Sequence, residues 1–388
     1  MAVEGVGSSL SADGVDITAE NGRGIGVTSA ALTFRNGSIN AKGDGITLSS
    51  LYQKPGGTAV VSHSRITSQN GNGINVNADQ AAADLDSVQV TALGDYGVAI
   101  WMPGSNTRVD VKDSILQTRG QSAVAIDNRG GVFTMDGGSI STLGDNSHAL
   151  YASPDTTNSP GAVFNVSRVL IETSGRGSVG ALARMAGASI SLSNSSIVTH
   201  GDLGYGLFAS GRGASVELQD SDVQTAGEQA HGLAISNNAT TRFQGSTVVT
   251  NGSNAHGIVS FATGAGVVND VEVTSSHIQT EDGAGILVNG GGLTTRFTDS
   301  SLVGRSGGEQ GTALWITDRA SGVLAGAVQL DAVRSNLFGD VLVDGGSLQL
   351  SLADHSSLDG AIKGGSRDTQ LSLDDSSCLL YTSPSPRD

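Results

Sequence analysis

The segment Leu218-Gln-Asp-Ser-Asp-Val-Gln-Thr-Ala-Gly227 contains the pattern on which the fold prediction depends. Its first residue is apolar, a second apolar residue follows at +5, a threonine at +7 and a glycine at +9. The same template recurs along most of the chain. Its first position holds Ala12, Phe34, Val61, Leu85, Val111, Met135, Val166, Leu192, Leu218, Phe243, Val273 and Phe297. The +5 partners are Ile17, Ile39, Ile66, Val90, Leu116, Ile140, Ile171, Ile197, Val223, Val248, Ile278 and Leu302, and +7 is threonine at Thr118, Thr142, Thr173, Thr199, Thr225, Thr250 and Thr280.

The period of the template identifies the architecture. Ala12 and Phe297 lie 285 residues apart over eleven intervals, so one repeat has about 26 residues. A third apolar pair follows a glycine in many copies, as in Gly232-Leu-Ala-Ile235. Each repeat therefore has three short apolar segments of period 2, separated by Gly, Asn, Asp and Ser turns. A propeller blade needs about 40 residues, and the consensus of a leucine-rich repeat is missing.

We therefore predict an all-β fold, a right-handed parallel β-helix (solenoid) of about 12 or more coils of about 26 residues, with three short strands per coil. It should form a single domain between Leu10 and Asp375, without a separate globular part. After Phe297 we expect the register to loosen, because the leucines alternate there with longer spacing.

The composition agrees with a long all-β protein and disfavours two kinds of partner. The 388 residues include 56 glycines, and charged residues make up only 15%. The formal net charge of −16 repels nucleic-acid phosphates and anionic lipid surfaces. No run of about 18 apolar residues is present to span a bilayer, and the first ten residues lack the features of a signal peptide.

The last eleven residues, Cys378-Leu-Leu-Tyr-Thr-Ser-Pro-Ser-Pro-Arg-Asp388, break the preceding pattern. They resemble a translated sequencing adapter, so we expect residues 378–388 to be a non-native tail that includes the only cysteine.

Several motifs carry a family resemblance, among them Asp220-Ser-Asp-Val-Gln-Thr-Ala-Gly227, the following Ala230-His-Gly-Leu233, and Leu350-Ser-Leu-Ala-Asp-His-Ser-Ser357. Over about residues 10 to 377 the chain resembles the passenger domain of pertactin-like autotransporters, the surface-exposed part of self-exporting outer-membrane proteins of Gram-negative bacteria. The resemblance implies that residues 1–377 are a fragment of a β-helical passenger domain.

The same resemblance implies a non-enzymatic adhesin or virulence-associated surface protein, at the cell surface or outer membrane or secreted. Its partner would be a host cell surface or extracellular matrix. It would be a monomer, attached to a membrane only through a C-terminal β-barrel missing from this sequence, with no nucleic-acid partner. Two alternatives stay open: a β-helical polysaccharide lyase or glycosidase, and a phage tailspike-like protein.

We expect binding to involve three loops that interrupt the template, namely 52–58, 103–108 and 153–161, because variable loops of a solenoid often carry function. The candidate binding residues are Tyr52, Pro55, Trp101, Pro103, Arg108, Pro154 and Pro160.

The polar residues of the repeat have structural interpretations. Acidic and amide side chains near +2 recur along the whole chain, which favours turn formation over a catalytic carboxylate pair. They are Asn36, Asp113, Asn194, Asp220 and Asp299. Tyr205, His231 and His256 share position +13 of consecutive repeats, so their rings should stack as a ladder, in preference to a metal site. We assign no catalytic, cofactor-binding or metal-binding residue and no cofactor.

Overall fold

The computed structural model describes residues 1–154, 161–305, 311–364 and 368–380. All regular elements in these ranges are β-strands, and no helix is present among them. The chain divides into two compact units. Unit 1 comprises Met1–Gly204 with Gly213–Ser215, and unit 2 comprises Tyr205–Arg212 with Val216–Asp388.

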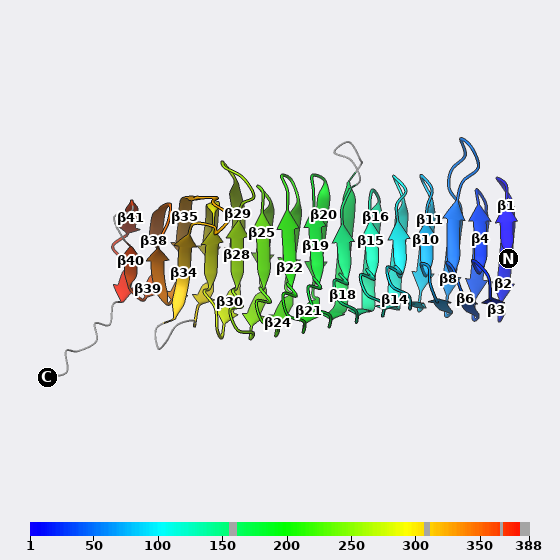
Figure 1. The fold of residues 1–388 in the computed structure, drawn as a ribbon, viewed down its shortest axis with the longest axis horizontal. Helices are drawn as coiled ribbons and strands as arrows, with labels where there is room; N and C mark the ends of the chain where they lie inside the picture. Colours follow the sequence, from blue (N-terminus) through cyan, green and yellow to red (C-terminus); the bar gives the residue numbers. More distant parts are fainter. Residues whose placement is uncertain (155–160, 306–310, 365–367, 381–388) are drawn as a thin grey trace. The chain divides into compact units, whose positions relative to one another are not determined.

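In unit 1, each coil adds one strand to a first parallel sheet and a pair of strands to a second sheet (Figure 1). The first sheet has the order β1 (Ala2–Glu4), β4 (Ile25–Thr28), β7 (Ile46–Ser49), β10 (Ile74–Val76), β13 (Ile100–Met102), β15 (Ile126–Asn128), β17 (Leu150–Ala152) and β19 (Ala181–Arg184). The second sheet contains β2 (Ser9–Asp13), β3 (Asp16–Ala19), β5 (Ala31–Arg35), β6 (Ser38–Ala41), β8 (Thr58–Ser62), β9 (Arg65–Ser68), β11 (Ala82–Asp86), β12 (Gln89–Ala92), β14 (Arg108–Thr118), β16 (Val132–Thr142), β18 (Ala162–Thr173), β20 (Ala188–Ser193) and β21 (Ser196–Thr199).

Unit 2 repeats this plan. Its first sheet has the order β22 (Leu207–Ser210), β25 (Leu233–Ser236), β28 (Ile258–Phe261), β31 (Ile286–Asn289), β34 (Thr312–Thr317), β37 (Asp340–Val343) and β40 (Ile362–Gly364). The second sheet contains β23 (Ser215–Gln219), β24 (Asp222–Thr225), β26 (Thr240–Gln244), β27 (Thr247–Thr250), β29 (Val268–Thr274), β30 (His277–Thr280), β32 (Gly291–Thr298), β33 (Ser301–Val303), β35 (Ala325–Val333), β36 (Asn336–Phe338), β38 (Ser347–Ala353), β39 (Ser357–Asp359), β41 (Thr369–Leu373) and β42 (Cys378–Leu380).

This architecture confirms the predicted parallel β-helix with a repeat of roughly 26 residues and about 13 turns. Three strands per coil is the rule, but in β14, β16 and β18 the two strands of the second sheet run on as one strand of 11 or 12 residues.

The strand register places the template residues in columns that run from coil to coil. Position 0 of one coil pairs with position 0 of the next, as for Phe34 and Val61, or Phe243 and Val273. The +5 residues do the same, as for Val223 and Val248. The side chains of Leu192, Leu218 and Phe243 are at most 2% exposed, so the predicted inward orientation is confirmed.

The position-0 column continues after Phe297, but the register shifts between β32 and β35 and between β34 and β37, so the expected loosening is confirmed at these two pairings. Phe297 pairs with Ala332, Ala332 with Leu352, and Leu352 with Leu373. The position-0 column could not be recognised in this part of the sequence for two reasons. Ala332 is small, and the next inward residue after Leu352 is Leu358, which follows at +6 instead of +5.

The adapter-like tail is in part included in the last coil. β42 pairs with β39, with Leu379 opposite Leu358, and residues 381–388 lie outside the described residues. The pairing needs only an apolar residue at the column position, so the non-native origin of residues 378–388 stays a prediction.

A column of buried threonines closes the turn after the second sheet. Position +7 is fully buried at all seven threonines. The hydroxyl of Thr118 donates to the carbonyl of Ala123 (2.6 Å), and that of Thr250 donates to the carbonyl of Ala255 (2.7 Å). Because the turn carbonyl has this partner inside the coil, the chain can reverse there without leaving a buried acceptor unsatisfied.

A second column, of buried serines at +3, joins successive coils. The backbone N–H of Ser246 donates to Oγ of Ser276 (3.0 Å), and the N–H of Ser276 donates to Oγ of Ser300 (3.1 Å). Each hydroxyl in turn donates to a carbonyl two residues earlier, as Ser276 does to Thr274 (2.7 Å). The serine of the Asp-Ser motif is therefore a coil-to-coil hydrogen-bond acceptor, a role that the sequence analysis missed.

We expect Leu218→Asp to lower the free energy of unfolding by several kcal/mol, because it places a charge in an apolar column without a partner. The neighbouring Gln219 is exposed, so Gln219→Asp is the matched control with a small effect. Urea denaturation measures both. A midpoint for Leu218→Asp equal to that of the control would contradict the inward assignment.

Ser276→Ala should cost about 1 to 3 kcal/mol, because the buried N–H of Ser246 loses its acceptor. The exposed Ser253→Ala serves as the control. Thermal unfolding of the two variants checks the expectation, and equal midpoints would show that the serine column does not stabilise the fold.

Candidate functional site

The loop of residues 50–57, between β7 and β8, is a true insertion. It has eight residues, whereas two residues connect β4 to β5 in the preceding coil. Tyr52 is 88% exposed and Pro55 is also exposed. The loop is anchored at its base, since the Ser29 hydroxyl donates to the Pro55 carbonyl (2.8 Å). Tyr52 is thus presented to solvent on an ordered support.

The segment around Pro103 is a smaller extension at this corner. Five residues connect β13 to β14, as they do β10 to β11, whereas two connect β4 to β5 and three connect β15 to β16. Pro103 is half-buried, whereas Arg108 is exposed at the start of β14 and forms an ion pair with Asp110. A role of this segment in binding stays a prediction.

In the third predicted loop, Pro154 is buried, and Pro160 lies outside the described residues. All three segments connect a strand of the first sheet to the next strand of the second sheet. They therefore lie at the same corner of alternate coils in unit 1, those of β7, β13 and β17.

Trp101 lies on the outer face of the first sheet, between the buried Ile100 and Met102. Its column continues with Asp127 and Tyr151 on the next two coils. Arg129 donates to both Asp127 carboxylate oxygens (2.5 and 2.8 Å), and its guanidinium carbon lies 5.0 Å from the centroid of the Tyr151 ring. Trp101 therefore belongs to a polar and aromatic outer surface, and not to the packed core.

The acidic and amide residues near +2 are confirmed as turn residues. The φ angles of Asn36, Asp113, Asn194, Asp220 and Asp299 lie between 43° and 51°, in the left-handed region that Asn and Asp tolerate better than most residues.

The predicted ring ladder is also confirmed. The centroids of Tyr205 and His231 are 5.1 Å apart with an interplanar angle of 20°, and those of His231 and His256 are 5.1 Å apart at 26°. We call Tyr205, His231 and His256 the ring column.

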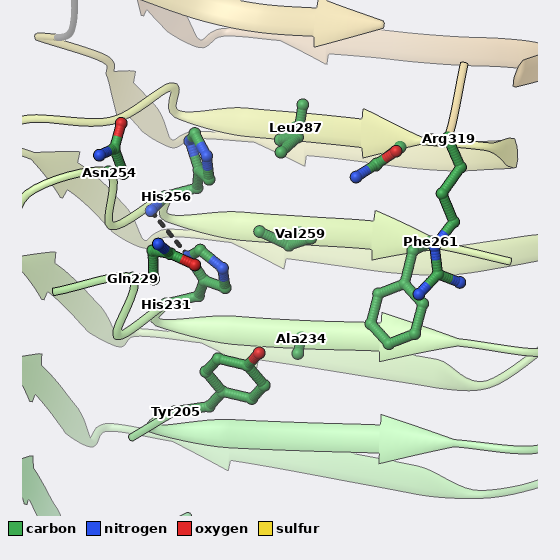
Figure 2. Close-up of a pocket in the computed structure, with 11 residues that line it drawn as sticks. Tyr205, Gln229, His231, Ala234, Asn254, His256, Val259, Phe261, Leu287 and Arg319 are labelled. Atoms are coloured by element: carbon green, nitrogen blue, oxygen red, sulfur yellow. Dashed lines mark hydrogen bonds between the residues drawn. The ribbon is translucent and has the colours of Figure 1, made fainter. Parts of the chain in front are cut away.

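The ring column forms one wall of a groove in unit 2 of about 380 Å³ (Figure 2). Ala234, Val259 and Leu287, from β25, β28 and β31, form its floor. The opposite wall contains Phe261 and Arg319, and Gln229 and Asn254 border the groove beside the histidines. Asn289, the register partner of Phe261, also lines the groove.

Arg319 is held across the face of Phe261. Its guanidinium carbon lies 5.0 Å from the ring centroid, and its Nη1 donates to the carbonyl of Ala262 (2.7 Å). The side chain comes from the connection between β34 and β35, two coils beyond Phe261. The sequence analysis missed both residues, because neither occupies a position of the template that carries a chemical signal.

The two histidines of the ring column have a defined tautomer. Nδ1 of His231 accepts the backbone N–H of His256 (3.1 Å), and Nδ1 of His256 accepts the backbone N–H of Ala284 (2.8 Å). A neutral imidazole that accepts at Nδ1 carries its proton on Nε2. Each histidine therefore presents a hydrogen-bond donor at Nε2.

Burial keeps both imidazoles neutral. It lowers the pKa of His231 to about 3, with a further contribution from His256, and lowers the pKa of His256 to about 4, although Asp282 acts in the opposite direction. Burial also raises the pKa of the Tyr205 hydroxyl. At neutral pH the ring column is uncharged.

No protein-family model and no curated protein matches this sequence. The structure is similar to a chain in the cryo-EM structure of the Vag8–C1 inhibitor complex, with a TM-score of 0.70 and 16% sequence identity, over 96% of this chain and 97% of that chain. Vag8 is an autotransporter passenger.

The chain has the fold of an autotransporter passenger domain. The resemblance to pertactin-like passengers predicted this fold. No helix among the described residues is long and apolar enough to cross a membrane.

Unit 2 should lose stability as the pH falls below about 6.5. A histidine whose pKa is lower in the folded state binds protons more readily when unfolded, so acid favours unfolding, by at most about 1.4 kcal/mol per pH unit for each histidine. The loss should begin below the unfolded pKa and continue to about pH 4 for His256 and to about pH 3 for His231.

His231→Phe keeps a ring but removes one titrating group. We expect it to be less stable at pH 7.5, because the N–H of His256 loses its acceptor, and to show a flatter pH dependence. The exposed His200→Gln is the control. Urea unfolding at pH 7.5, 6 and 4.5 measures the slopes, and an unchanged slope for His231→Phe would contradict the assignment.

Proposed function

We propose that the chain is a non-enzymatic autotransporter passenger, surface-exposed or secreted by a Gram-negative bacterium, that binds a host cell-surface or matrix protein. Within this proposal it is a monomer that acts as an adhesin or virulence-associated surface protein. The passenger fold supports the class. The similar chain comes from a complex with C1 inhibitor, which gives a precedent for a protein partner on this fold.

The observation that supports the proposal most directly is the protonation and hydrogen bonding of the two groove histidines, His231 and His256. General base catalysis needs an unprotonated nitrogen that can accept a proton at working pH. In His231 and His256, a backbone N–H occupies Nδ1 and the proton occupies Nε2. Both groups can donate a hydrogen bond to a ligand but are poorly placed to abstract a proton, so the groove is suited to binding.

The alternative of a polysaccharide lyase or glycosidase requires two carboxylates facing one cleft. The recurring Asp113, Asp220 and Asp299 occupy left-handed turn positions. The residues that line the groove, all of them described, include no Asp or Glu. We therefore expect no release of reducing ends or unsaturated products when the protein is incubated with acidic and neutral polysaccharides. Product from any polymer would contradict the non-enzymatic assignment.

We propose that the loops at 52–58 and 153–161 and the Trp101 surface of unit 1 contribute to partner binding. Replacement of residues 50–57 by a two-residue turn, matching the connection from β4 to β5, should reduce binding to host cells or matrix severalfold, because Tyr52 is lost.

Ser253→Ala, at an exposed serine of unit 2 outside the three segments, provides the control. Binding is measured with labelled protein on cells and on immobilised matrix. Equal binding by the shortened variant and the parent would remove loop 52–58 from the contact surface.

A further inference from the structure

The floor of the groove belongs to an unusual column of unit 2. On the first sheet, the outward residues of successive coils are Phe208, Ala234, Val259, Leu287, Trp315 and Leu342. The corresponding outward column of unit 1 contains Thr47, Asn75, Trp101, Asp127 and Tyr151. A sheet face that meets solvent normally carries polar side chains. In this column Phe208, Trp315 and Leu342 are half-buried, and Ala234, Val259 and Leu287 are at most 8% exposed, so only a narrow apolar strip is open at the floor of the groove.

The walls give this apolar column a chemical preference. His231 and His256 present Nε2–H donors, and Arg319 presents the positive charge. The groove residues Gln229, Asn254 and Asn289 add amides, and no lining residue is acidic. In a chain of net charge −16, a groove lined by donors and one cation is complementary to a carboxylate.

Arg319 lines the groove without an ion pair to any described residue, whereas three other arginines of unit 2 are paired. Arg242, Arg305 and Arg334 each form an ion pair with an acidic residue. Among the described residues, the structure gives Arg319 no carboxylate partner: its contacts are the Phe261 ring and the Ala262 carbonyl. A guanidinium has five N–H groups, so most of its donors are available.

The arrangement of the rings argues against a sugar as the preferred ligand. A pyranose packs its C–H face against an open aromatic face. In the ring column His231 is stacked on both faces, between Tyr205 and His256, and Arg319 covers a face of Phe261. The floor consists of aliphatic side chains, which suit an aliphatic side chain of a peptide.

We propose that the groove binds an extended segment of a partner protein, with an aliphatic side chain on Val259 and Leu287 and the carboxylate of an Asp or Glu two residues away on Arg319. Side chains on one face of an extended peptide recur about every 6.6 Å, and neighbouring coils are about 4.8 Å apart, so a segment of a few residues spans the floor. This inference rests on the proposed function, because it assigns the chemistry of one contact made by a protein-binding passenger.

The test uses the full chain labelled at histidine and the capped peptide Ac-Leu-Ala-Glu-NH2 as the probe, in which Leu and Glu share one face. Titration should shift the imidazole NMR signals of His231 and His256 and saturate at millimolar concentration. Ac-Leu-Ala-Gln-NH2 and the Arg319→Gln variant should each weaken binding about tenfold or more, because a charge-assisted pair is lost. Higher salt should weaken the Glu peptide more than the Gln peptide.

Arg296→Gln, an exposed charge change on β32, is the matched control and should bind the Glu peptide like the parent. Arg319→Lys keeps the charge and should retain part of the affinity, which separates the charge from the hydrogen bond to Ala262. Circular dichroism and the unfolding midpoint establish that the Arg319 variants are folded.

Three results would overturn the inference: no shift at either histidine with 20 mM peptide, equal affinity for the Glu and Gln peptides, or binding of 3′-sialyllactose in the groove in preference to the peptide. None of these results decides the proposed function, which depends on the polysaccharide and cell-binding assays. Conversely, release of product from a polysaccharide would contradict the proposed function whatever the peptide does.

Discussion

The in-register parallel pairing of each coil with the next is the constraint on which the rest of the structure depends. A single coil cannot bury its apolar residues or satisfy the N–H and C=O groups that point along the axis. Pairing meets both needs when position 0 faces position 0, as for Val273 and Phe297. The buried serines add a hydrogen bond from coil to coil beside this core, as between Ser276 and Ser300. A shift of register by one residue would turn the apolar residues outward.

The same register creates the outer surface. Because residues at one template position lie about 4.8 Å apart in successive coils, side chains on the outer face also form columns. In unit 1 the column is polar with aromatic members, such as Trp101 and Tyr151, and in unit 2 it is apolar, such as Val259 and Leu287. The ring column beside the apolar column provides donors, since the backbone of the next coil fixes the tautomers of His231 and His256. The binding groove is therefore a consequence of stacking and needs no separate domain.

Most of the fold could be predicted from the sequence, because the same spacing of apolar and turn residues recurs in each of twelve repeats. The columns of position 0 and +5, the turn residues such as Asp220, and the stacking of Tyr205 with the histidines all followed from spacing. The groove could not be predicted, since Arg319 comes from a connection outside the template and reaches Phe261 from two coils away. Loop lengths also varied beyond what the sequence revealed, since the connection after β7 has eight residues and the one at Pro103 has five.

A distance measurement along one column tests the central claim of in-register stacking most directly. Gln224, Val249, Gln279, Val303, Phe338 and Asp359 are register partners in successive coils of unit 2. Spin labels at Gln224 and Phe338, or at Gln224 and Asp359, in a Cys378→Ser background should give double electron–electron resonance distances that correspond to backbone separations of about 19 Å and about 24 Å. The account predicts that the difference equals the spacing of one coil. Equal distances for the two pairs, or a broad distribution for either, would contradict it.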